Sequence, residues 1–131
     1  EFVVSGVKFS FYVSDNFSPI KSPVEYMGNI RLADVNSILA MKMEVMLRRM
    51  KLRDYYDVYA ILKEGYSIAD GIEGALKYSK HKLSSKNIVV MLLSGRFTPD
   101  HNFEQLEPKY NVTKDEIREY ILQKLKNEQL G

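Results

Sequence analysis

The chain has 131 residues, of which 45% are hydrophobic, enough for one small domain that buries about two-thirds of its unfolded surface. Nineteen basic and 17 acidic side chains leave a formal charge of only +2, so the overall charge does not indicate nucleic-acid binding. The absence of cysteine excludes disulfides and thiolate metal sites, and no apolar run approaches the ~20 residues that span a bilayer. We therefore expect a globular cytoplasmic protein that does not enter a membrane.

The first part of the chain predicts β structure followed by a loop. Ser5 and Gly6 are typical of a two-residue hairpin turn. The stretch 7–13 alternates apolar and polar side chains with a period of two, which is typical of a half-buried strand. Residues 14–31 are rich in Asp, Asn, Pro and Gly and predict a loop, with a short extended piece at 30–32.

From residue 34 onward the pattern becomes helical. Asp34 is the expected N-cap of a first helix over 34–50. A second helix ends near Lys63, because a glycine follows at position 65. Ser67 is the expected cap of a third helix that runs to about Lys82.

The last third of the chain predicts two more helices. The apolar run at 87–93, after a cap at Ser84 or Ser85, predicts a short helix, although such a run is equally typical of a buried strand. Residues 97–111 contain two prolines and predict an irregular stretch. The Thr-Lys-Asp-Glu sequence at 113–116 is a capping box and starts the last helix.

Together these elements predict an α+β fold that is mostly α. A β-hairpin or strand remnant at 1–31 precedes an antiparallel helical bundle at 32–131. Because the chain enters its first strand without an initiator methionine, we expect it to be a piece of a longer protein.

Charged residues stand where the helical pattern expects apolar ones. On a helical wheel Lys42 lies within an apolar arc, and Asp54 and Asp57 share the apolar side of the next helix. The arc is formed by Val35, Ile38, Leu39, Val45, Met46 and Met50. A buried charge is tolerated only when it is paired, bound to a ligand or used in function. We therefore expect Lys42 and the two aspartates to meet at one pocket wall. A lysine there can hold a polyphosphate as a point charge, with Arg49 as a second phosphate contact.

Two simpler interpretations remain open for these residues. Lys42 could extend its ammonium from the helix edge into water while burying its methylenes. Asp54 could be the N-cap of the second helix, with Asp57 in the favourable first turn.

The stretches 32–42 and 47–59 resemble the AbiEii/AbiGii family of abortive-infection nucleotidyltransferase toxins. That family has a helix with an inward lysine, followed by the pattern Arg-x-Lys-x-(Arg/Lys)-Asp-x-x-Asp-hydrophobic-Tyr. Here the lysine is Lys42, and the pattern runs from Arg49 through Asp54 and Asp57 to Tyr59.

The resemblance implies a fold related to DNA polymerase β, a nucleoside triphosphate as substrate, magnesium as cofactor and an acceptor such as RNA. A cognate antitoxin is a further candidate partner. The candidate catalytic residues are Lys42, Asp54 and Asp57, and the candidate substrate-binding residues are Arg49, Lys51 and Arg53.

The chain departs from the family in its first residues. The family carries a Gly-Ser and an Asp-x-Asp motif on an upstream strand, whereas the strand region here offers only Ser10, with Asp15 beyond it. Two-metal chemistry needs carboxylates that hold the ions ~3.5–4 Å apart. We therefore assign no metal ligand and expect the isolated chain to be inactive. The alternative is a noncatalytic helical module that binds RNA or a protein.

Overall fold

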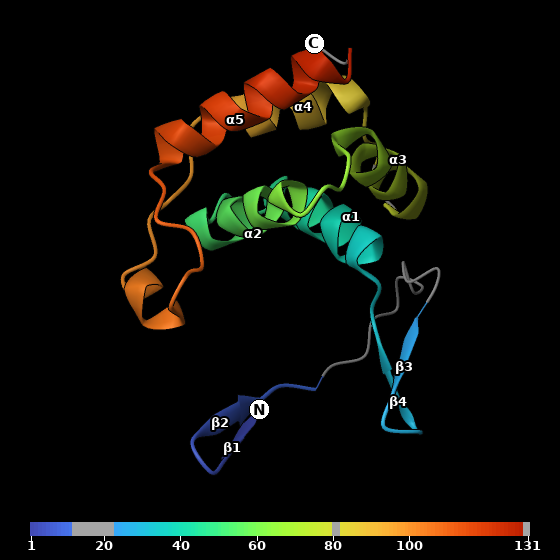
Figure 1. Cartoon of the computed structure of the whole chain (residues 1–131), viewed down its shortest axis with the longest axis vertical. Coiled ribbons are helices and arrows are strands. Elements are labelled where there is room, and N and C mark those ends of the chain that lie inside the picture. The colour runs from blue at the N-terminus through green and yellow to red at the C-terminus, as the bar shows by residue number, and fades with distance from the viewer. Residues whose placement is uncertain (12–22, 80–81, 130–131) are drawn as a thin grey trace.

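The computed structural model describes residues 1–11, 23–79 and 82–129. In this part of the chain two small antiparallel hairpins precede five α-helices and one 3₁₀ helix (Figure 1). The predicted α+β, mostly α class is therefore confirmed. None of the helices in the described ranges is both long and apolar enough to cross a membrane.

The first hairpin pairs β1 (Phe2–Val4) with β2 (Val7–Phe9). Its turn is the predicted one, since Ser5 and Gly6 both have positive φ angles, of 51° and 78°. A two-residue turn of this kind follows the natural twist of the flanking strands. Strand β2 ends at Phe9, four residues before the predicted end of the strand, and residues 12 and 13 lie outside the described ranges.

The expectation that this strand is half-buried is wrong. Val7, Phe9 and Phe11 are all exposed, because no element of the described chain covers the hairpin. Phe2 stacks on Phe9 and on Phe11, with ring centroids 5.5 Å apart in each case. The hairpin therefore packs only against its own aromatic side chains.

A second hairpin lies within the stretch predicted as loop. It pairs β3 (Val24–Tyr26) with β4 (Ile30–Leu32), so the extended piece at 30–32 is confirmed and β3 was missed. Three residues are too few to display a period, and only the partner strand identifies β3. The rest of the predicted loop, 14–22, lies outside the described residues.

The helical part consists of α1 (Val35–Met46), α2 (Leu52–Lys63), α3 (Ile68–Tyr78), α4 (Ser85–Leu93) and α5 (Lys114–Asn127). Helices α4 and α5 form a layer on one side of α1 and α2, and α3 joins the two layers at one end (Figure 1). Side-chain N-caps start four of these helices. They are Asp34, Ser67, Ser84 and Thr113, the last within the predicted capping box.

Two helices end earlier than predicted. Helix α1 stops at Met46, and the end of the following link, 47–51, pairs with Thr98. The Thr98 N–H donates to the Met50 carbonyl at 2.7 Å, and its carbonyl accepts from the Leu52 N–H at 2.9 Å. Helix α3 ends at Tyr78, four residues before the predicted end.

The two uncertain stretches of the C-terminal half are also resolved. The apolar run at 87–93 is helix α4, as one of its two interpretations predicted. The stretch 97–111 is irregular as predicted, except for the 3₁₀ helix η1 (Phe103–Leu106).

The buried face of α1 is rotated from the predicted arc. Leu39, Met43 and Met46 are fully buried, whereas Val35 is exposed. Gly71 of α3 explains this packing, because a Cβ there would lie 2.8 Å from both Leu39 Cγ and Met43 Cε. Lys42 consequently lies at the border of the core and not in the middle of it.

Two helix N-termini are stabilised by carboxylates that are distant in sequence. Helix α2 starts after Lys51 without a side-chain cap of its own, and Asp100 accepts from the Arg53 N–H at 3.0 Å. Glu128 at the end of α5 accepts from the N–H groups of residues 68 and 69, both at 3.0 Å. These bonds satisfy backbone donors that have no partner within their own helix.

The start of α2 is also held by aromatic packing. The buried Tyr55 ring stacks on Phe97, with centroids 3.9 Å apart, and its hydroxyl donates to the Leu92 carbonyl at 2.7 Å. Burial raises the pKa of Tyr55, so the hydroxyl keeps its proton. The residues that precede and follow Tyr55 are therefore fixed in position by α4 and the stretch after it.

Candidate functional site

Lys42, Asp54 and Asp57 meet between α1 and α2. The Lys42 ammonium lies 2.9 Å from Asp54 Oδ1 and 2.7 Å from Asp57 Oδ2. Helices α1 and α2 are packed together, and the two aspartates lie three residues apart on one side of α2. The predicted convergence of these three side chains is confirmed.

Arg49 completes this group from the α1–α2 link. Its Nε lies 3.0 Å from Asp54 Oδ2, and its Nη2 lies 3.3 Å from Asp54 Oδ1. Two parallel N–H bonds to one carboxylate fix both direction and distance. We call Lys42, Arg49, Asp54 and Asp57 the Lys42 cluster.

The members of the Lys42 cluster differ in their exposure to solvent. Asp54 is 0% exposed. The side chains of Lys42, Asp57 and Arg49 are 28%, 42% and 44% exposed. The cluster therefore has one buried anion, with two cations and a second anion around it that reach solvent.

Both simpler interpretations of these residues are corrected by the geometry. The N-cap position of α2 belongs to Lys51, and Asp54 lies in the first turn with its carboxylate bound to two cations. Lys42 does lie at the edge of its helix, but its ammonium ends on two carboxylates instead of extending freely into water.

The electrostatics of the cluster keep its buried members charged. Burial by itself would raise the pKa of Asp54, but hydrogen bonds and positive charge from Lys42 and Arg49 outweigh it and lower that pKa below its usual value. Burial would likewise lower the pKa of Lys42, yet Asp57 and Asp54 together raise it. At neutral pH the cluster therefore contains an ammonium and a buried carboxylate.

The other two candidate substrate-binding residues lie outside the cluster. Lys51 occupies the N-cap position of α2, and its backbone pairs with Thr98. Arg53 is exposed, and its Nε lies 3.9 Å from Asp100 Oδ1. Sequence reasoning missed Asp100 and Thr98, because no spacing rule connects residues more than 40 positions apart.

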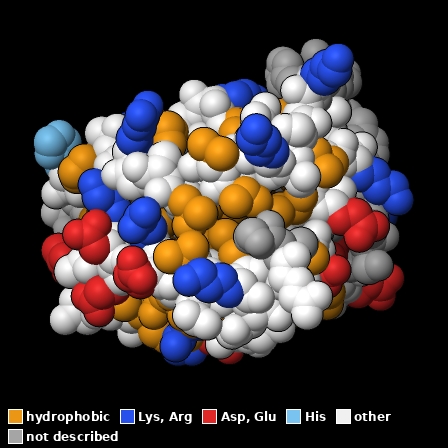
Figure 2. Space-filling view, turned by 90° about the horizontal axis from the view of Figure 1, so that it is seen from above, with side chains coloured by type: hydrophobic (Ala, Val, Ile, Leu, Met, Phe, Trp, Pro, Cys, Tyr) orange, Lys and Arg blue, Asp and Glu red, His pale blue; other side chains and the backbone are white. Residues whose placement is uncertain are grey.

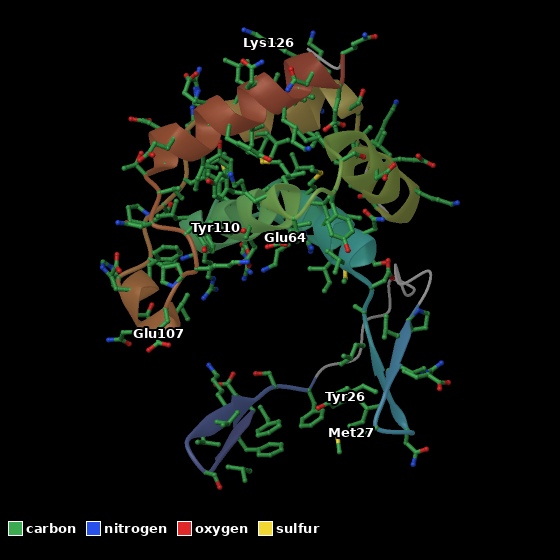
Figure 3. All side chains as sticks on the ribbon, in the orientation of Figure 1. Tyr26, Met27, Glu64, Glu107, Tyr110 and Lys126 are labelled. Atoms are coloured by element: carbon green, nitrogen blue, oxygen red, sulfur yellow. The ribbon has the colours of Figure 1, made fainter. Side chains whose placement is uncertain are left out.

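A second polar cluster lies at the other end of α2. Glu64 Oε1 accepts from Lys109 Nζ at 2.9 Å and from the Tyr110 hydroxyl at 3.0 Å, and Figure 3 shows Glu64 and Tyr110 facing each other. The Tyr110 N–H donates to the Tyr56 hydroxyl at 2.8 Å. These contacts attach the irregular stretch to α2. We call Glu64, Lys109 and Tyr110 the Glu64 cluster.

The described residues do not fit a magnesium centre. They contain no group of three or more His, Cys, Asp or Glu side chains placed to hold a metal ion. Both oxygens of Asp54 already accept from Lys42 or Arg49, and the carboxylate is inaccessible to solvent. Asp15, the acid that follows the predicted strand at 7–13, lies outside the described ranges.

A comparison with protein families decides the classification. The family described as "Nucleotidyl transferase AbiEii toxin, Type IV TA system" matches residues 6–128. The chain belongs to the AbiEii family. The match includes the Lys42 cluster and all five α-helices of this AbiEii protein. No curated protein and no solved structure matches the chain.

Proposed function

We propose that the Lys42 cluster binds the phosphates of a nucleoside triphosphate in a nucleotidyl transferase that moves a nucleotide to an acceptor such as RNA. The observation that carries this proposal is that Lys42 and Arg49 converge on one buried carboxylate while both remain partly exposed. A lysine so placed acts as a point charge for phosphate oxygens, and an arginine adds a planar fork of donors. Membership of the AbiEii family supplies the reaction class.

The charge balance of the cluster sets a condition on this binding. Two cations and two carboxylates sum to zero, and Asp57 would repel an incoming phosphate. Lys42 must therefore exchange its contact with Asp57 for one with the phosphates. As the bond to the leaving pyrophosphate breaks, the charge that develops there increases the attraction to Lys42.

Magnesium is the cofactor that we propose from the reaction class, since it neutralises triphosphate charge in such transfers. The described residues do not supply its ligands, so we derive no step through it. An antitoxin is the functional partner that we propose, because the family description names a type IV toxin–antitoxin system. A cytoplasmic location is proposed with them, since triphosphates and RNA occur there.

We do not propose a contact surface for RNA. On the face formed by α4 and α5, Lys and Arg side chains are spread around a central apolar area instead of forming one stripe (Figure 2). A basic stripe is the electrostatic feature that binding to a nucleic-acid backbone requires. On this face we therefore propose no contact surface for RNA, and RNA enters the proposal as the acceptor.

The test compares substitutions of two cations, Lys42 inside the cluster and Arg48 outside it, in the full-length protein incubated with labelled triphosphates, magnesium and RNA. Lys42→Met should lower labelling by about a hundredfold or more, the usual size of losing a charge contact in the transition state. Arg48→Gln is the control, because Arg48 pairs with Glu44 at 2.7 Å, outside the cluster. Near-normal labelling by Lys42→Met would show that the Lys42 cluster does not bind the triphosphate, whereas no labelling by the wild type would favour the noncatalytic RNA- or protein-binding module.

A further inference from the structure

The two carboxylates of the Lys42 cluster are held in different ways. Asp54 is inaccessible to solvent and receives three hydrogen bonds, one from Lys42 and two from Arg49. Asp57 is 42% exposed and, among the residues that the structure describes, has one ion pair, with Lys42. A ligand arriving from solvent can therefore reach Asp57 but not Asp54.

Asp54 is also the most firmly placed member of the cluster. It lies in the first turn of α2, between the Arg53 N–H that is bound by Asp100 and the Tyr55 ring that stacks on Phe97. Lysine and arginine side chains are among the most mobile, and ordering them opposes binding. A fixed carboxylate that holds both cations orders their side chains when the protein folds. Their ordering then no longer opposes ligand binding.

We propose that Asp54 is a positioning residue that holds Lys42 and Arg49 in place for a polyphosphate, and that Asp57 is the exchangeable partner that Lys42 releases when the polyphosphate binds. This inference rests on the proposed function for the identity of the ligand. It assigns Asp54 no contact with substrate or metal, and it gives the two aspartates of the motif different roles.

The first experiment follows the Lys42 ammonium by NMR of the ¹⁵N-lysine-labelled chain, with Lys42→Arg identifying the signal. An ammonium held by hydrogen bonds exchanges its protons slowly enough to be seen. Asp54→Asn should abolish the signal, whereas Asp57→Asn should retain it. Loss of the signal in Asp57→Asn would overturn the assignment, and this variant decides the matter even if Asp54→Asn does not fold, because Asp57 is partly exposed.

The second experiment titrates the same proteins with inorganic tripolyphosphate in a calorimeter. Asp57→Asn should bind roughly threefold to tenfold more tightly, because one repelling charge is removed near the ligand. Asp54→Asn should bind roughly tenfold more weakly, because the cations are no longer held in place. Glu64→Gln is the matched control, since it removes one negative charge from the far end of α2, and its affinity should equal that of the wild type.

The two experiments separate the inference from the proposed function. If the ammonium signals behave as expected but no protein binds tripolyphosphate, Asp54 positions the cations and the proposed phosphate ligand is wrong. If tripolyphosphate binds and Asp57→Asn weakens it, Asp57 is not the exchangeable partner and the inference is overturned.

Discussion

Helix α2 carries an ion-pair cluster at each end, and the two clusters are nearly identical in distance. The Lys42–Asp54 and Lys109–Glu64 contacts are both 2.9 Å long. They differ in burial, since Asp54 is 0% exposed and the Glu64 side chain is 55% exposed. Distance alone therefore does not tell which pair matters for stability or function.

The difference follows from the solvent around each pair. In water, charges at this separation attract weakly and salt screens them, so exposed pairs contribute little. A fully buried carboxylate has lost its hydration, and removing one of its partners leaves an uncompensated charge. Substitution of the buried Asp54 should therefore have effects that the same substitution of Glu64 does not have.

The largest expected effect is on nucleotide transfer by the full-length protein. Asp54→Ala should lower turnover by about a hundredfold, because Lys42 and Arg49 lose the carboxylate that holds them. Single-turnover labelling of RNA measures this loss. The same substitution at Glu64 should leave turnover unchanged, and equal losses from both substitutions would show that burial does not distinguish the two clusters.

The next effect is on the free energy of unfolding of the chain. Asp54→Ala should lower it by about 3 kcal/mol, the lower end of the range for breaking a buried ion pair, because Lys42 and Arg49 can still reach water. Urea denaturation followed by circular dichroism measures the change. A loss of only ~1 kcal/mol would be typical of removing a helix cap and would argue that Asp54 acts only on the α2 terminus.

The pH dependence of stability should carry the signature of the buried pair. The pKa of Asp54 is lowered by folding, so its contribution is complete above its unfolded pKa of ~3.9 and is lost as the pH falls through the lower folded value. The pKa of Lys42 is raised, so its contribution is lost as the pH rises above ~10.4. Asp54→Asn should remove most of the acid-side slope in urea titrations below about pH 4. An unchanged slope would contradict this assignment.

The smallest effect is expected in the Glu64 cluster. Hydrogen bonds from Lys109 and Tyr110 lower the pKa of Glu64, but the group is in contact with solvent. Glu64→Gln should leave the melting temperature of the chain unchanged within error, in low and in high salt. If Glu64→Gln clearly lowered the melting temperature in low salt but not in high salt, the exposed ion pair would contribute to stability, contrary to this expectation.

The sequence by itself determined the features that depend on neighbouring residues. The caps at Asp34, Ser67 and Thr113 each bond within one helical turn, so their residue types and spacing are sufficient to predict them. The meeting of Lys42 with Asp54 was also predictable, since only 12 residues and one short link separate them.

Only the tertiary structure decided how these elements are buried. The buried face of α1 differs from the predicted arc because Gly71 lets α3 approach Leu39 and Met43. No pattern within α1 reveals this contact. Asp100 and Glu128 bind N–H groups in the first turns of helices, and these groups lie 47 and 60 residues before them. Helical periodicity also placed Asp54 and Asp57 on the same face of the second helix, without a difference in burial. Their difference in burial, with one carboxylate buried and the other partly exposed, depends on which side chains cover each one. Packing between helices sets this cover, and periodicity within one helix does not.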